Sequence, residues 1–196
     1  MASNKPINTR KAMYIDFDKA LGDTLERYWD LPLYEKIMRQ VGIVNVSSDE
    51  DLQKTYNYFY QVRRNEAWRR SYYDLFEQMK HTKNVSFSVI ITELFRTTGN
   101  IEASFSSKML STLNPSKPIW DSIVCKNLGL KPTGKTKEEE LKNVIVLYEK
   151  LEGWYKEYLK TENAQDCITR FDALLPKYVW LSDTKKIDYL IWSIRE

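Results

Sequence analysis

One lysine and one aspartate in the middle of the chain have the residue types and setting that covalent chemistry needs. Lys108 follows an aromatic residue and two serines, and Asp121 follows Pro118, Ile119 and Trp120. A neutral lysine amine is a nucleophile that can form a Schiff base, and a carboxylate can stabilise positive charge on a substrate. Spacing alone also permits a simpler interpretation. In it, Lys108 is an exposed helix lysine and Asp121 is a first-turn carboxylate favoured by the helix dipole.

The remaining residue inventory argues against most other catalytic centres. The only histidine, His81, lies in the polar run 80–83, which is typical of a solvated loop and a poor place for a triad. The two cysteines, Cys125 and Cys167, are far apart, so a zinc finger or ribbon is excluded and a reduced protein is expected. The carboxylate run 138–140 is typical of a helix start. We therefore expect neither a metal nor a cofactor.

Length and composition indicate a globular protein of modest size. The 196 residues are 42% hydrophobic and 29% charged, which fits one domain, or a fused pair of subdomains over 13–85 and 86–196. The net charge of +3 permits nucleic-acid binding but does not require it. The first residues lack the apolar core of a signal peptide, and no apolar run is long enough to span a membrane. We expect a cytoplasmic monomer.

Apolar residues recur at helical spacing along nearly the whole chain, which predicts an all-α bundle of roughly eight to ten helices. The expected helices cover 14–29, 31–41, 52–60, 68–79, 86–98, 104–113, 118–129, 136–160, 163–175 and 183–194. Ser104 and Thr136 are predicted N-caps, and either Ser182 or Asp183 is expected to cap the last helix. The helix 86–98 is expected to begin at Ser86, and Gly99 is its predicted C-terminal stop. Pro118 suits the first turn of its helix.

A dense basic cluster lies between the third and fourth of these helices. Its members are Arg63, Arg64, Arg69 and Arg70. Such a cluster is able to contact the phosphates of double-stranded DNA. The alternative is a solvated face whose arginines pair with nearby carboxylates, such as Glu66, Asp74 and Glu77.

Two segments around the lysine and the aspartate carry a resemblance to a known family. The run Ser104–Leu110 and the run Pro118–Val124 resemble the small 8-oxoguanine-glycosylase-like proteins of bacteria, within the helix-hairpin-helix DNA glycosylase superfamily. Residues 186–192 resemble the closing helix of that family, so the resemblance covers about 86–194. The superfamily's hairpin turn has the form Leu-Pro-Gly-x-Gly. Residues 98–103 of this chain have one glycine.

The resemblance implies an enzyme that removes a damaged or modified base from DNA, with or without lyase activity, in repair or in defence against foreign modified DNA. In that case Lys108 is the nucleophile and Asp121 is the catalytic carboxylate. Phe105, Trp120 or a tyrosine would stack on a flipped base, and Asn100 lies in the turn that would contact a phosphate. The alternative is a helical module that binds DNA or protein without catalysis.

Overall fold

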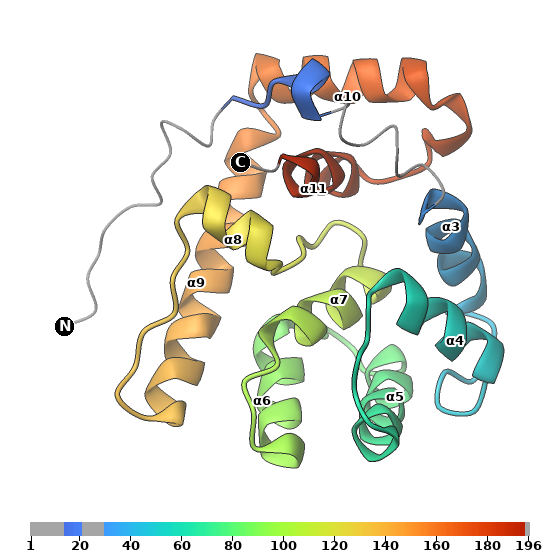
Figure 1. The fold of residues 1–196 in the computed structure, drawn as a ribbon, viewed down its shortest axis with the longest axis vertical. Coiled ribbons are helices and arrows are strands. Elements are labelled where there is room, and N and C mark those ends of the chain that lie inside the picture. Colours follow the sequence, from blue (N-terminus) through green and yellow to red (C-terminus); the bar gives the residue numbers. More distant parts are fainter. Residues whose placement is uncertain (1–13, 21–29, 195–196) are drawn as a thin grey trace. The chain divides into compact units, whose positions relative to one another are not determined.

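The computed structural model describes residues 14–20 and 30–194, and these residues are helical or lie in turns and loops without any β-strand (Figure 1). They contain nine α-helices and one short 3₁₀-helix, besides a helical stretch over residues 17–20. The all-α prediction is therefore confirmed. Most of the expected helix 14–29 lies outside the described residues.

The chain divides into two compact units. Among the described residues, one unit contains 30–114, and we call it the central unit; the other joins 14–20 to 115–194, and we call it the terminal unit. The expected boundary at 85/86 falls inside the central unit, between two helices that pack against each other.

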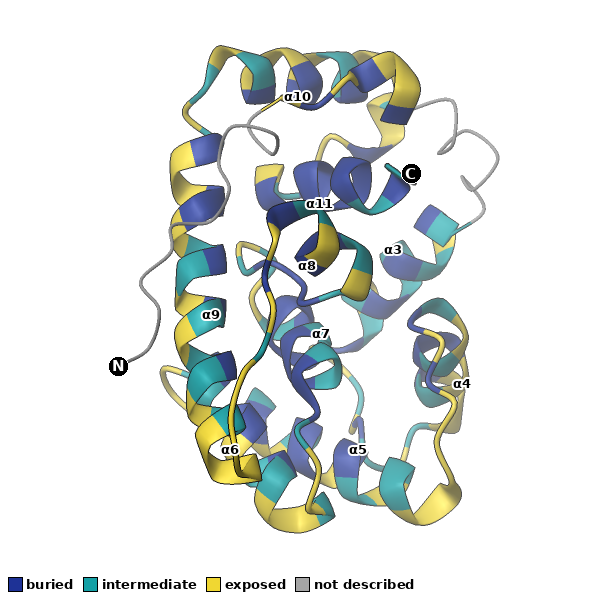
Figure 2. Cartoon of the chain, turned by 60° about the vertical axis from the view of Figure 1, so that its left-hand side comes forward, coloured by how far each residue is buried: buried dark blue, intermediate teal, exposed yellow. Residues whose placement is uncertain are grey.

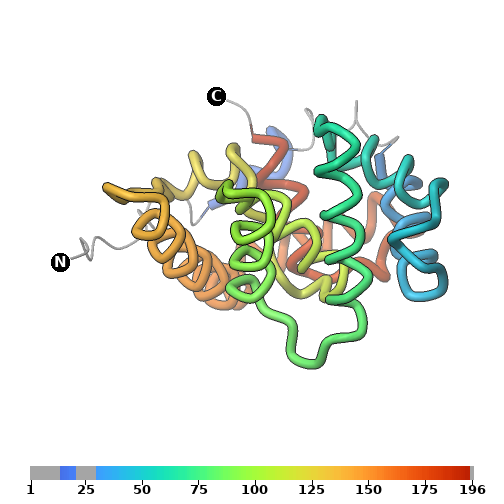
Figure 3. The backbone as a smooth tube through the Cα atoms, turned by 90° about the horizontal axis from the view of Figure 1, so that it is seen from below, coloured from blue at the N-terminus to red at the C-terminus, as the bar shows by residue number. Residues whose placement is uncertain are grey.

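Five helices build the central unit: α3 (Asp30–Gln40), α4 (Glu50–Phe59), α5 (Glu66–Lys80), α6 (Phe87–Thr98) and α7 (Ala103–Leu113). Helix α3 packs on α4, α5 packs on α6, and α6 packs on α7. Figure 3 shows α5 and α6 side by side, joined by the loop over residues 81–86. Buried aromatic side chains dominate this unit, because α4 and α5 turn Tyr56, Tyr72, Tyr73 and Phe76 toward its interior.

Local hydrogen bonds explain where most of these helices begin and end. The Asp49, Asn65 and Ser86 side chains accept from the backbone N–H three residues later, as N-cap residues do. Gly99 ends α6 in the left-handed conformation, with φ of 68°. The predicted start and stop of α6 are thus confirmed.

The prediction that Ser104 caps α7 is wrong. The helix begins at Ala103, and Glu102, two residues before Ser104, occupies the N-cap position without a capping hydrogen bond to its side chain. The Ser104 carbonyl instead accepts from the Ser107 hydroxyl, as an ordinary residue inside the helix. The Glu102 carboxylate is bound by groups from α5 and the segment before it.

The terminal unit contains α8 (Ser122–Leu128), α9 (Lys137–Tyr158), α10 (Glu162–Leu174), the 3₁₀-helix η1 (Pro176–Tyr178) and α11 (Asp183–Ser193). Helix α11 packs on both α8 and α10, and Figure 2 shows it buried along most of its length. Asn163 on α10 binds the backbone of Ile15. Its side-chain oxygen accepts from the Ile15 N–H at 2.8 Å, and its NH₂ group donates to the Ile15 carbonyl at 3.1 Å.

The prediction that Pro118 opens a helix is also wrong. Residues 118–121 lie before α8, and Asp121 is the N-cap of that helix. Two buried side chains bind this non-helical segment: the Tyr148 hydroxyl donates to the Pro118 carbonyl at 2.7 Å, and the Asp188 carboxylate accepts from the Ile119 N–H. These two bonds fix residues 118 and 119 against α9 and α11 in a non-helical conformation, and α8 begins only after Asp121.

Candidate functional site

Lys108, the expected nucleophile, lies on α7 in a half-buried position against aromatic rings. Its Nζ lies 5.1 Å from the centroid of the Phe105 ring and 5.7 Å from that of the Tyr60 ring. Nζ also donates to the Tyr60 carbonyl at 3.2 Å. The negative faces of the rings attract the ammonium, while their apolar bulk removes part of its water. The surroundings of this lysine differ from those of a freely solvated helix lysine.

Arg64 and Glu102 form an ion pair next to this lysine. One Glu102 carboxylate oxygen accepts from Arg64 at 2.8 Å, and the other accepts from the Trp68 indole N–H at 3.1 Å. Glu102 is only 4% exposed, so both partners are needed to offset the loss of its hydration. The Arg64 guanidinium in turn lies 5.3 Å from the centroid of the Phe105 ring.

Phe105 is therefore contacted by two cations, Arg64 and Lys108, and the Glu102 carboxylate pairs with Arg64. We call this group the aromatic–cation cluster, and its members are Tyr60, Arg64, Trp68, Glu102, Phe105 and Lys108. The cluster brings together Arg64, Phe105 and Lys108, for which the sequence predicts three separate roles. Arginine and lysine side chains are able to contact a phosphate, and a lysine amine is of a type that attacks electrophilic carbon.

Two buried tyrosines, Tyr56 and Tyr72, form a hydrogen-bonded chain that ends on the part of α7 that carries the cluster. The Tyr56 and Tyr72 hydroxyls are 2.8 Å apart, and the Tyr72 hydroxyl donates to the Phe105 carbonyl at 3.0 Å. The Tyr72 ring also stacks on Trp68, with 4.9 Å between the centroids. Burial raises the pKa of both tyrosines far above the usual value of 10, so they stay neutral and act as hydrogen-bond donors.

Asp121, the expected catalytic carboxylate, lies in the terminal unit. One of its carboxylate oxygens accepts from the Ile123 N–H at 2.7 Å, which caps α8. Asp121 is half-buried, and the neighbouring Trp120 is buried with 8% of its surface exposed. Lys108 belongs to the central unit, so the convergence of these two groups on one substrate stays a prediction.

Asp188 is a buried carboxylate in the terminal unit that the sequence analysis did not single out. It accepts from the Tyr155 hydroxyl at 3.1 Å and lies 3.5 Å from the Lys185 ammonium. Burial raises the pKa of Asp188 and outweighs the opposite effects of Lys185, Tyr155 and the Ile119 N–H. The charge of Asp121 raises it further. Asp188 thus bonds the backbone two residues before Asp121 and interacts with its charge.

The four clustered arginines differ in their surroundings. Arg63 donates to the Gln61 side chain at 3.1 Å, and Arg70 pairs with Glu66 at 3.3 Å. Arg64 joins Glu102, and Arg69 faces a groove between α4 and α5. Arg70 therefore fits the alternative prediction, in which the arginines lie on a solvated face and pair with nearby carboxylates. Arg64 instead belongs to the aromatic–cation cluster.

Asn100 is exposed in the turn between α6 and α7. Its backbone N–H donates to the Thr98 hydroxyl at 3.2 Å, and its side-chain amide donates to the Thr98 carbonyl at 3.3 Å. The turn contains a single glycine, Gly99, whose N–H bonds to Phe95 at 2.8 Å. The N–H groups of residues 99 and 100 thus already have acceptors within the turn.

Glu102 and Trp68 were missed as site residues, although both contact residues that the sequence analysis had named. Glu102 lies 38 residues from Arg64, so no local spacing connects them. Trp68 was interpreted as one more apolar residue of a helix, and a tryptophan gives no sequence signal of the acceptor that its indole N–H will find.

Within residues 14–20 and 30–194, no group of three or more histidine, cysteine, aspartate or glutamate side chains is placed to hold a metal ion. In the same ranges, none of the helices has both the length and the apolar character needed to cross a membrane.

Comparison with known proteins adds no relative: no protein-family model, no curated protein and no solved structure matches the chain.

Proposed function

We propose that this protein is a DNA glycosylase that removes a damaged or modified base through its lysine amine. The position of Lys108 against Phe105 and Tyr60 carries the proposal. A lysine must lose its proton before it can attack, and the Phe105 and Tyr60 rings keep part of the bulk water away from its Nζ. Arg64 places a second cation at the same Phe105 ring.

In the proposed reaction, the Lys108 amine forms a bond to C1′ of the nucleotide while the bond from C1′ to the base breaks. The base leaves with the bonding electron pair and takes up a proton, and opening of the sugar converts the adduct into a Schiff base. Asp121 would stabilise the positive charge that develops on the sugar. The base must first leave the helical stack, and Phe105 or Trp120 would stack against it.

The proposal extends to the setting in which the enzyme works. It would act on double-stranded DNA as a cytoplasmic monomer, without a cofactor. The same chemistry serves either repair of damaged bases or removal of modified bases from foreign DNA. Arg63, Arg64, Arg69, Arg70 and Asn100 would contact the DNA backbone.

Borohydride trapping tests the nucleophile directly. Reduction of a Schiff base links the protein permanently to DNA, so we expect a slower-migrating complex on at least one duplex from a panel of modified bases. The Lys108→Gln variant should give no complex, while the Lys83→Gln variant, which removes an exposed lysine of the same unit, should give as much as the wild type. Trapping that survives in Lys108→Gln would reject the assignment.

A second candidate is a DNA-binding or protein-binding module without catalysis. It is favoured by the ordinary structural roles of the two groups, since Asp121 caps α8 and Lys108 bonds a backbone carbonyl. Mass spectrometry of bases released from natural and modified DNA distinguishes the candidates. Salt-sensitive DNA binding without any released base would support the module and contradict the enzyme.

A further inference from the structure

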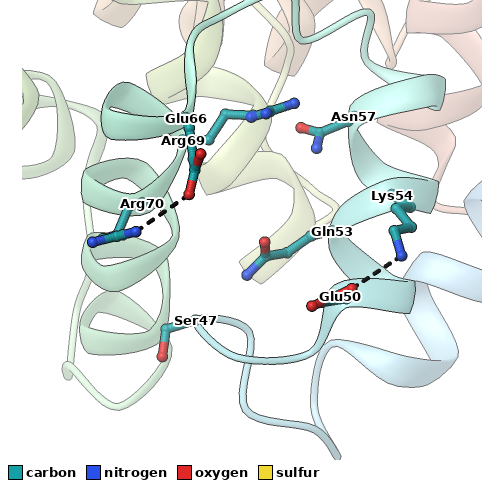
Figure 4. Close-up of a pocket in the computed structure, with 8 residues that line it drawn as sticks. All are labelled: Ser47, Glu50, Gln53, Lys54, Asn57, Glu66, Arg69 and Arg70. Carbon is teal, nitrogen blue, oxygen red and sulfur yellow. Dashed lines mark hydrogen bonds and ion pairs between the residues drawn. The ribbon is translucent and has the colours of Figure 1, made fainter.

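The groove between α4 and α5 in the central unit has the features of a phosphate site. It has a volume of about 290 Å³, near the lower end of ligand pockets, which is room for one phosphate with its sugar. The residues that line it are Ser47, Glu50, Gln53, Lys54, Asn57, Glu66, Arg69 and Arg70 (Figure 4).

Most charges around the groove are already paired along their own helices. Glu50 pairs with Lys54 at 3.0 Å on α4, and Glu66 pairs with Arg70 at 3.3 Å on α5. Figure 4 shows both pairs at the edge of the groove. The fifth charge, on Arg69, has no carboxylate partner among residues 14–20 and 30–194. The groove therefore carries one uncompensated positive charge.

Arg69 is half-buried and reaches from α5 toward Asn57 on α4 (Figure 4). The oxygen of the Asn57 amide accepts from the Tyr73 hydroxyl at 2.7 Å, which orients the amide and leaves its NH₂ group to donate elsewhere. Gln53 is oriented in a similar way, because its NH₂ group donates to the Val46 carbonyl at 2.8 Å. The side chains across from Arg69 are thus arranged before any ligand arrives.

We infer that this groove binds the phosphate group of a nucleotide, with Arg69 and Asn57 as its ligands. The planar guanidinium of Arg69 donates two parallel hydrogen bonds to phosphate oxygens, and the Asn57 NH₂ group donates a third. Lys54 and Arg70 neutralise the two carboxylates and so keep the groove open to an anion. The inference deepens the DNA-binding part of the proposed function, and it does not depend on base release.

The test compares Arg69→Gln with Arg96→Gln, which removes the same charge from the exposed face of α6 in the same unit. Binding of a labelled duplex is followed by fluorescence anisotropy over a series of salt concentrations. Loss of one phosphate contact should lower the slope of log affinity against log salt by about 1 for Arg69→Gln, whereas Arg96→Gln should leave it unchanged. If the two variants have equal slopes of log affinity against log salt, the groove does not bind a phosphate of DNA.

A second variant tests the site in case Arg69→Gln fails to fold. A second probe distinguishes a phosphate of DNA from a free phosphate. Asn57→Asp keeps the oxygen that bonds Tyr73 but replaces the donor by a repelling carboxylate, so it should weaken binding more than Arg69→Gln does. Inorganic phosphate and deoxyadenosine monophosphate are titrated while the Arg69 side-chain N–H signal is observed by NMR. A shift with these ions but no effect on duplex binding supports a site for free phosphate. No response in either experiment rejects the site.

Discussion

The ion pair between the buried Glu102 and the partly exposed Arg64 offers the sharpest test of how the aromatic–cation cluster is built. In Glu102→Gln the amide oxygen can still accept from the Trp68 indole, but the charge that balances Arg64 is lost. Hydrogen bonds to charged groups contribute about 1.5–3 kcal/mol. Because the Arg64 side chain is 42% exposed, water screens part of the interaction, and we expect the free energy of unfolding to fall by about 1–2 kcal/mol.

The assay is urea unfolding followed by circular dichroism on four proteins: wild type, Glu102→Gln, Arg64→Met and the double variant. Arg64→Met keeps an apolar side chain against Phe105 and removes the charge. If the pair stabilises the fold, the two single variants together should lose more free energy of unfolding than the double variant does. The difference is the coupling energy, which we expect to be about 1 kcal/mol. Strictly additive effects would show that the ion pair contributes nothing and that the reasoning about this cluster is wrong.

Three further predictions concern other parts of the chain. Gly153 is exposed within α9 and a Cβ would meet nothing within 4 Å, so Gly153→Ala should raise the free energy of unfolding by about 1 kcal/mol in denaturant titrations; a loss of stability would contradict this. Burial raises the pKa of Glu77, but hydrogen bonds from Lys80, a backbone N–H and a histidine outweigh it and lower the pKa from 4.5 to about 2. Its stabilising effect is complete above pH 4.5 and is lost as the pH falls toward 2, so Glu77→Gln should flatten the acid side of a stability profile, and an unchanged profile would refute the assignment. Burial raises the pKa of Cys125 to about 12 and that of Cys167 to about 11, so both thiols should react with a thiol reagent at pH 8 far more slowly in the native protein than in urea; equal rates would contradict their burial.

The helices that were predicted well are those whose ends depend on neighbours in sequence. Ser86 caps α6 and Gly99 ends it, and Thr136 and Ser182 cap α9 and α11, as the residue types indicated. A capping hydrogen bond joins residues three apart, so the sequence contains both partners in one short window. The two errors, at Ser104 and Pro118, fall where groups from distant helices bond the segment.

In the candidate site, too, the sequence predicts what depends on residue type and near neighbours, and it does not predict contacts between distant segments. Lys108, Phe105 and Arg64 could be named from their types and local setting. That they gather around one ring depends on the packing of α7 against the segment that leads into α5. Glu102 could not be found beforehand, because a carboxylate in a loop shows no sign of the arginine that it will meet.

The amino-acid order alone determined that this chain is helical, where most of its helices start and stop, and which of its side chains are chemically competent. These properties arise from hydrogen bonds and apolar spacing within a few residues. Only the tertiary structure decided that Glu102 is buried against Arg64 and Trp68 and that Asp188 binds the backbone before Asp121. It also left Arg69 as the uncompensated charge of its groove. Burial and long-range pairing set the energies of charged groups, and both exist only once distant segments have packed together.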